Sequence, residues 1–84
     1  MTVIVIKEEC HGVIGVAANE RAAKQMLIDI DWVNKYSELW SEEKLKWISL
    51  VELYGKNWLE EFLNFTKKQM EDMGYYLREE EVYE

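Results

Sequence analysis

Two short apolar runs, separated by a polar segment, open the chain. Residues 2–7 are rich in Val and Ile on both faces, which is typical of a central strand covered on both sides or paired on both edges. The polar segment 8–12 ends in Gly and predicts a turn. Residues 13–17 then predict a second, antiparallel strand, in which Gly15 indicates a bulge or a close approach by another backbone.

Apolar side chains at helical spacing follow a residue that caps helices. Asn19 is a favourable N-cap, and Glu20 suits the positive end of a helix dipole. The apolar positions of this segment are Ala22, Ala23, Met26, Leu27 and Ile30. The spacing predicts a helix over 20–30 and a connection over 31–37.

The segment that follows allows two interpretations. Residues 38–48 carry aromatic and β-branched side chains on both sides of a polar centre, which favours a short hairpin. The polar centre begins with Ser41 and two glutamates, which is also typical of a helix start. A helix from Ser41 is therefore the alternative to the hairpin.

Capping signals predict a short and then a longer helix. Ser49 and Glu52 match a capping box, and Gly55 ends the short helix that follows. Asn57 repeats the capping pattern before a helix over 58–73. The apolar face of that helix comprises Trp58, Leu59, Phe62, Leu63, Thr66, Met70 and Met73.

The last segment completes an α+β pattern. Gly74 suits the left-handed C-terminal position of the long helix, and residues 75–83 predict a strand whose acidic centre favours a sheet edge. The element order is β-β-α-β-β-α-α-β. Strands grouped in this way predict a single domain over 1–84, with a small antiparallel sheet and helices packed on one face.

The composition indicates a folded, acidic protein. Hydrophobic residues make up 49% and aromatic residues 13% of the chain, whereas disordered chains are poor in both. The net charge of −7 argues against direct nucleic-acid binding and against docking on an anionic membrane. One Cys excludes an internal disulfide, and the apolar runs are too short to span a membrane. The N-terminus lacks the pattern of a signal peptide, so we expect a cytoplasmic protein.

The negative charge is concentrated near the C-terminus. Residues 71–84 hold one base and six acids. One interpretation is a solvated terminus that keeps the protein soluble. The other is an acidic surface that competes, in place of a phosphate backbone, for a basic groove on a partner.

Few residues offer catalytic or metal-binding chemistry. Cys10 and His11 are adjacent, and adjacent strand residues point to opposite sides, so we interpret this segment as a hairpin turn with a half-buried Cys. One Cys and one His cannot form a structural zinc site alone, although Glu8 and Glu9 accompany His11. We therefore predict no catalytic residue, no metal and no cofactor.

Aromatic residues are denser than a small core requires. Six of them lie within residues 32–58, namely Trp32, Tyr36, Trp40, Trp47, Tyr54 and Trp58. They form either an aromatic-rich core or a surface for a partner or a second copy, since aromatic residues are enriched at interface hot spots. The predicted partner-binding residues are Glu79, Glu80, Glu81, Trp40, Trp47 and Tyr76.

Two segments carry a resemblance to a known group of proteins. The sequence Glu-Glu-Cys-His-Gly-Val-Ile-Gly-Val-Ala at 8–17, then a capped Ala-rich helix and Trp32-Val33, resembles small proteins encoded by phages and prophages of Gram-positive bacteria. The ending, Tyr-Tyr-Leu at 75–77 and an acidic strand, is similar to them too. The resemblance implies a small accessory phage protein. Some such proteins, several anti-CRISPR proteins among them, are acidic and non-enzymatic and occlude a nuclease's nucleic-acid groove.

Three functions follow from these patterns. The first is a non-enzymatic interaction module that binds a basic groove on a larger protein, such as a nucleic-acid enzyme of host defence. The second is a self-assembling accessory protein, a homodimer joined by an edge strand or an aromatic patch. The third is a small-ligand binder or an enzyme, with the turn at residues 10–12 near its site.

Overall fold

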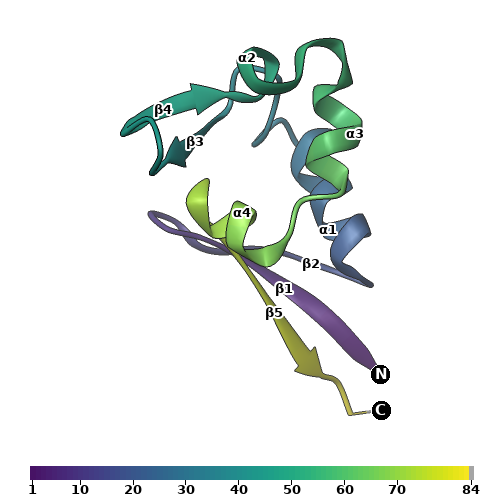
Figure 1. Cartoon of the computed structure of the whole chain (residues 1–84). Helices are drawn as coiled ribbons and strands as arrows, with labels where there is room; N and C mark the ends of the chain where they lie inside the picture. The colour runs from purple at the N-terminus through teal and green to yellow at the C-terminus, as the bar shows by residue number, and fades with distance from the viewer. Residues whose placement is uncertain (84) are drawn as a thin grey trace.

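The computed structural model describes residues 1–83 and has an α+β architecture, which confirms the predicted class (Figure 1). Its elements are β1 (Thr2–Glu8), β2 (Gly12–Ala17), α1 (Glu20–Asp29), β3 (Glu38–Ser41), β4 (Lys46–Ser49), α2 (Leu50–Tyr54), the 3-10 turn η1 (Gly55–Asn57), α3 (Trp58–Leu63), α4 (Lys67–Asp72) and β5 (Tyr75–Glu81). The strands form two antiparallel sheets, one of three strands and one of two. The last strand ends at Glu81 rather than at the predicted residue 83.

Strand β1 is the centre of the three-stranded sheet, whose order is β2-β1-β5. Both neighbours are antiparallel to it, so the predicted pairing on both edges is confirmed. Ile4 and Ile6 of β1 are buried, whereas Val3 and Val5, on the other face, are only partly buried. The helices therefore cover one face of this sheet and leave the other open.

A bulge interrupts the pairing of β1 with β2. Ile6 lies opposite Gly15 and Lys7 lies opposite Val13, so Ile14 is the extra residue. Gly15 also meets a close neighbour, because a Cβ at this position would lie 2.7 Å from the Sδ atom of Met26. The predicted bulge is therefore confirmed, whereas the alternative of a close approach by another backbone is wrong, because the neighbouring atom belongs to a side chain.

The predicted hairpin at residues 38–48 is confirmed as the β3–β4 sheet, and the alternative helix from Ser41 is wrong. Leu39 lies opposite Ile48, and both are buried. The hairpin leads into α2, where the Ser49 side chain accepts a hydrogen bond from the amide of Glu52. The strands thus divide between two sheets, and the hairpin lies across α4 from the three-stranded sheet (Figure 1).

The predicted single helix over 58–73 is wrong, because the chain leaves the helical path between α3 and α4. Thr66 starts a new helix through a reciprocal capping box with Gln69. The turn before it buries Phe65, whose carbonyl accepts a hydrogen bond of 2.7 Å from the Lys24 amine. Asn57 is the N-cap residue of α3, as predicted, but its side chain makes no capping hydrogen bond.

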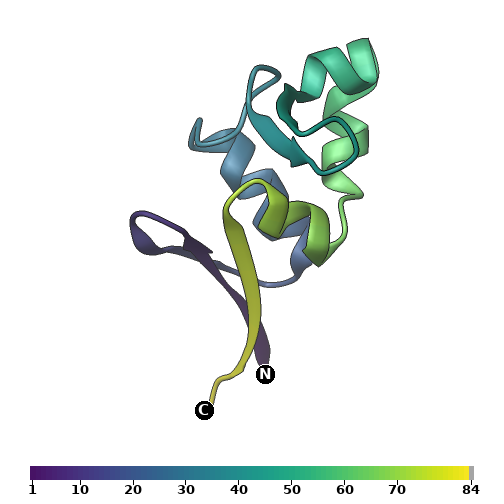
Figure 2. The same cartoon turned by 60° about the vertical axis from the view of Figure 1, so that its left-hand side comes forward.

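Lys24 on α1 is a buried cation that joins α1 to the break between α3 and α4. Burial lowers the pKa of its amine because the charged form loses hydration. The hydrophobic core of the protein includes Ile6, Leu27 and Phe62, all with no exposed area. Past this core, strands β1 and β5 continue side by side as a ribbon that projects beyond the helices (Figures 1 and 2).

Candidate interaction surfaces

The open face of the three-stranded sheet carries apolar side chains. The strand register places Val5 opposite Val16, and Lys7 opposite both Val13 and Tyr76, on this face. The exposed fractions of the side chains are 61% for Val13, 52% for Val16 and 41% for Tyr76. Three neighbouring strands thus expose apolar side chains to solvent on this face, with Lys7 between Val13 and Tyr76.

This face is hollowed into a groove of about 530 Å³. The groove is lined by Val5, Lys7, Glu9, Val13, Tyr76 and Arg78. Two of these residues are basic and one is acidic, and Glu80 on the same face contacts the Arg78 guanidinium. The open face is therefore close to neutral in a chain whose net charge is −7.

The acidic run of β5 is divided between the two faces of the sheet. Glu79 lies opposite Ile4 and Glu81 lies opposite Thr2, whereas Glu80 is on the open face. Glu81 has an oxygen 3.6 Å from the N-terminal ammonium, and Glu80 is paired with Arg78. These pairs are exposed, and pairs of this kind stabilise a fold by only about 0–1 kcal/mol.

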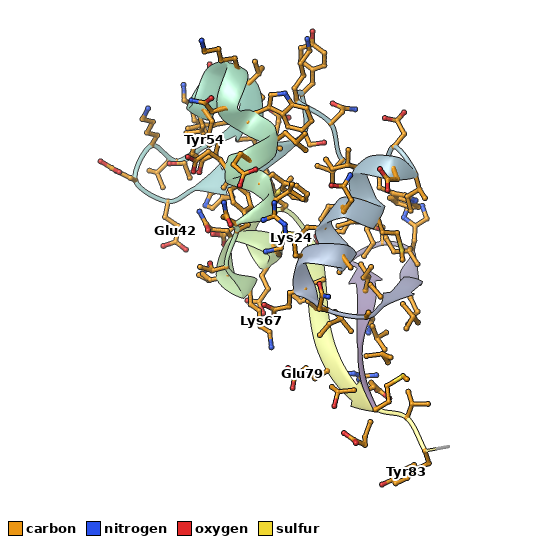
Figure 3. The ribbon with its side chains drawn as sticks, turned by 90° about the vertical axis from the view of Figure 1, so that its right-hand side faces the viewer. Lys24, Glu42, Tyr54, Lys67, Glu79 and Tyr83 are labelled. Atoms are coloured by element: carbon orange, nitrogen blue, oxygen red, sulfur yellow. The ribbon has the colours of Figure 1, made fainter. Side chains whose placement is uncertain are left out.

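Glu79, Glu80 and Glu81 share their place on the projecting ribbon. Figure 3 shows Glu79 on the part of β5 beyond the helices, with Tyr83 further out. Glu79 and Glu81 are exposed, and Glu80 is half-buried. The carboxylates are thus accessible from several sides of the ribbon end rather than forming one flat patch.

The two tryptophans predicted to bind a partner lie against each other on the other sheet. Trp40 and Trp47 face each other across β3 and β4, with ring centroids 5.6 Å apart and the ring planes at 67°. Trp40 is half-buried, whereas Trp47 is 53% exposed. The structure therefore brings these two residues together on the two-stranded sheet, whereas Tyr76 and the acidic run of β5 belong to the three-stranded sheet.

The remaining aromatic residues fit both predicted roles. Tyr54 and Trp58 pack against the core, as an aromatic-rich core requires. Tyr36 is exposed, and Trp32 lies at the surface beside the turn between β1 and β2. The aromatic surplus is therefore divided between the interior and the surface.

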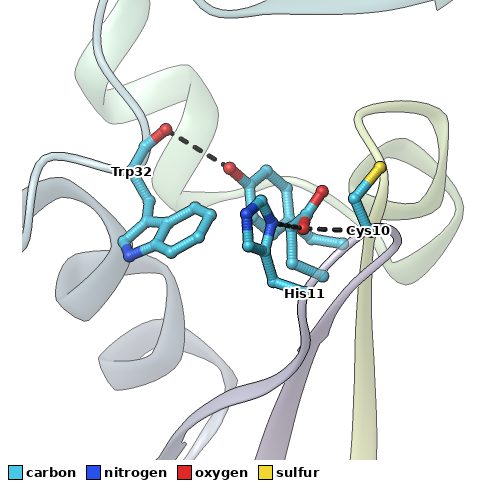
Figure 4. Close-up of polar contacts among 5 residues, drawn as sticks. Cys10, His11 and Trp32 are labelled. Atoms are coloured by element: carbon cyan, nitrogen blue, oxygen red, sulfur yellow. Dashed lines mark hydrogen bonds and ion pairs between the residues drawn. The ribbon is translucent and has the colours of Figure 1, made fainter.

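The turn at residues 9–11 is organised by a carboxylate (Figure 4). The Glu8 carboxylate accepts a hydrogen bond of 3.0 Å from the Cys10 amide and lies 2.5 Å from Nδ1 of His11. The bond with His11 is the main reason that the pKa of Glu8 is lowered. Cys10 is exposed, so the prediction of a half-buried thiol is wrong.

The same turn is held against the body of the protein by aromatic contacts. The His11 and Trp32 rings form a T-shaped pair with centroids 5.1 Å apart, and the Tyr75 hydroxyl donates to the Trp32 carbonyl at 3.3 Å. Burial raises the pKa of the Tyr75 hydroxyl. His11 is thus engaged by Glu8 and Trp32, which anchors the hairpin turn.

Among residues 1–83, no three His, Cys, Asp or Glu side chains gather where they could hold a metal ion. Within the same range, no helix has the length and apolar character needed to cross a bilayer.

Two features of the structure escape prediction from sequence. The open sheet face depends on which strands become neighbours, and the buried Lys24 depends on the break between α3 and α4. The charge-free sequence of β2, visible as Gly-Val-Ile-Gly-Val-Ala, is the one signal that sequence offers for an unprotected sheet edge.

The chain was compared with known proteins at three levels. No protein-family model, no curated protein sequence and no solved structure matches it.

Proposed function

We propose that this chain is a non-enzymatic interaction module that binds a basic surface on a larger protein. The observation that carries the proposal is the run Glu79–Glu81 at the end of a ribbon that projects beyond the helices. A projecting ribbon enters a groove without requiring the helical body to move. Its carboxylates then take the place of phosphate groups against the arginines and lysines of the partner.

The ion pairs within the ribbon do not prevent this binding. Arg78 pairs with Glu80 and the N-terminal ammonium with Glu81, and all of these groups lie at the surface. Because exposed pairs are weak, a partner's guanidinium groups replace them at little cost. Complementary charge also speeds the encounter and makes binding sensitive to salt.

The finer proposal concerns the class of partner. The resemblance to phage and prophage proteins favours a partner in the host cytoplasm whose basic groove ordinarily holds nucleic acid, such as a defence nuclease. The chain then acts as an inhibitor by occupying that groove, in the manner of an anti-CRISPR protein. Trp40 and Trp47 supply a second, aromatic contact where the partner is large enough to reach the β3–β4 hairpin.

The test compares two triple variants of equal charge. One replaces Glu79, Glu80 and Glu81 by Gln, and the control replaces the exposed residues Glu52, Glu61 and Glu71 by Gln. Immobilised wild type and both variants capture proteins from a lysate of a Gram-positive host, and the affinity of each captured, purified protein is then measured. We expect the ribbon variant to lose at least about tenfold in affinity and the control to lose little.

Two further measurements test whether the ribbon binds a basic, nucleic-acid-binding surface. Raising the salt from about 50 mM to about 500 mM should weaken the wild-type complex, because screening removes the attraction between exposed charges. A duplex DNA or RNA fragment should compete with the wild type for the captured protein. Equal binding by both triple variants, or no competition by nucleic acid, would contradict the proposal.

A further inference from the structure

The two outer edges of the three-stranded sheet differ in charge. Strand β5 carries Arg78 and the run Glu79–Glu81, whereas β2, Gly-Val-Ile-Gly-Val-Ala, has no charged residue. Charged side chains protect an edge strand from pairing with another chain. In the part of the chain that the structure describes, β2 is paired only with β1. The unpaired backbone N–H and C=O groups on the outer edge of β2 are therefore not protected by charged side chains.

The bulge in β2 places two apolar side chains of this edge strand on the same face of the sheet. Residues three positions apart in a regular strand point to opposite faces. The extra residue Ile14 cancels this alternation, so that Val13 and Val16 both lie on the open face, each more than half exposed. Two β-branched side chains thus stand on the same side of an unpaired edge.

The positions of these two valines are self-complementary. If a second β2 is added antiparallel about a twofold axis between Ile14 and Gly15, Val13 lies opposite the partner's Val16. The symmetry gives the reciprocal pair as well. Cross-strand pairs of β-branched residues are a favourable unit of sheet stability.

Charge is compatible with self-association at this surface. Two chains that each carry a net charge of −7 repel each other. The open face adds little to this repulsion, because Lys7 and Arg78 offset Glu9 and Glu80 there. A second copy therefore approaches β2 along a strip without net charge.

The geometry points to a second copy of this chain as the occupant of the β2 edge. The two copies form one six-stranded antiparallel sheet of order β5-β1-β2-β2-β1-β5, and the valines on the open faces become continuous across the twofold axis. The acidic β5 strands end at the two outer edges, where they remain free. The inference is independent of the proposed function, because it uses the opposite edge of the sheet.

The first test is sedimentation equilibrium of the full chain and of two lysine variants. Val16→Lys places a charge in the β2 edge, and Tyr76→Lys places the same charge on the same face but on β5. We expect Val16→Lys to raise the dimer dissociation constant at least about tenfold, although it lowers the net repulsion. Tyr76→Lys should change it by less than about threefold.

Three results would overturn the inference. They are a wild-type chain that stays monomeric up to about 1 mM, an unchanged dimer in Val16→Lys, and an equal loss in both variants. The last result would mean that the two open faces pack against each other instead of pairing by strands. The melting temperature and circular dichroism of each variant verify that the fold is intact.

The second test fixes the register by oxidation in a Cys10→Ser background. With both Val13→Cys and Val16→Cys, each new thiol lies opposite a thiol of the other copy, and a covalent dimer should form. Val13→Cys alone is the matched control, because its two copies lie about 10 Å apart along the strands, beyond disulfide reach. A covalent dimer that forms equally well with the single substitution would contradict the register.

Salt separates this inference from the proposed function. Screening weakens the repulsion between two acidic chains, so the dimer should become tighter as salt is raised. Binding of the acidic ribbon to a basic partner should become weaker under the same conditions. Dimerisation that weakens with salt would contradict pairing through the neutral β2 edge.

Discussion

Strands β2 and β5 pair with the same central strand, yet they present opposite chemistry at their free edges. β5 ends in a run of carboxylates on a ribbon beyond the helices, while β2 is short, bulged and free of charge. An acidic edge repels a second copy and attracts a basic protein, whereas a neutral edge allows a second copy to pair. The small sheet thus offers two edges that differ in charge, and we propose a different partner for each.

The largest expected effect comes from the strand that both edges share. Ile6 in β1 is fully buried beneath the helices, so Ile6→Ala should lower the free energy of unfolding by about 2–5 kcal/mol. Urea denaturation measures the loss. Val13→Ala, at an exposed position of β2, is the control and should cost less than about 1 kcal/mol. Similar losses in the two variants would contradict the assignment of buried and open faces.

A smaller loss of stability is expected from a substitution in β2. A Cβ at Gly15 would lie 2.7 Å from the Met26 sulfur, so Gly15→Ala forces this flexible side chain to move and should destabilise the fold by about 1 kcal/mol. In a Met26→Ala background the obstruction is absent, and the same substitution should cost much less. Thermal or urea unfolding of the four chains gives the coupling. Additive changes in the free energy of unfolding would mean that the Met26 side chain does not obstruct a Cβ at position 15.

The turn that joins β1 to β2 makes the stability depend on pH. Because His11 and the Cys10 amide lower the pKa of Glu8 below its ordinary value of 4.5, the ionised carboxylate stabilises the folded state. This contribution is complete above the ordinary value and is lost as the pH falls through the lowered pKa of the folded state.

Glu8→Gln should therefore flatten the fall in melting temperature between about pH 6 and about pH 3. Glu9→Gln is the control, because its side chain lies in the same segment and has no such hydrogen bonds among residues 1–83. A wild-type pH profile in Glu8→Gln would show that the carboxylate does not hold the turn.

The smallest change in stability is expected from a substitution in β5. Glu80→Gln removes the exposed ion pair with Arg78, and we expect the free energy of unfolding to change by less than about 1 kcal/mol. The same substitution should leave dimerisation unchanged. A larger loss of stability, measured by urea denaturation, would mean that the acidic ribbon is a structural element rather than a binding surface.

Local signals in the sequence predict much of this fold. The N-cap at Asn19, the Ser49 cap and the valine-rich first strand depend on neighbouring residues, and the structure contains all three. The predicted helix over 58–73 fails because its apolar spacing continues across the break, and only the Thr66–Gln69 capping box indicates a new start. Burial of Phe65 and its bond to Lys24 favour the break, and both involve residues distant in sequence.

The candidate surfaces were less accessible to sequence reasoning. Trp40 and Trp47 lie together because they are neighbours in a predicted hairpin. Their separation from Tyr76 depends on the division of the strands between two sheets, which no local pattern indicates. The faces of Glu79–Glu81 follow from the strand period, but the bulge that brings Val13 and Val16 to one face requires the register of β1.

Backbone hydrogen exchange at low and at high protein concentration tests the difference between the two edges most directly. The account predicts that amides of β2 become more slowly exchanging as concentration rises, because a second copy pairs with this edge. The amides of β5 that point away from β1 should exchange at the same rate at both concentrations. Slower exchange in β5 with no change in β2 would contradict the account.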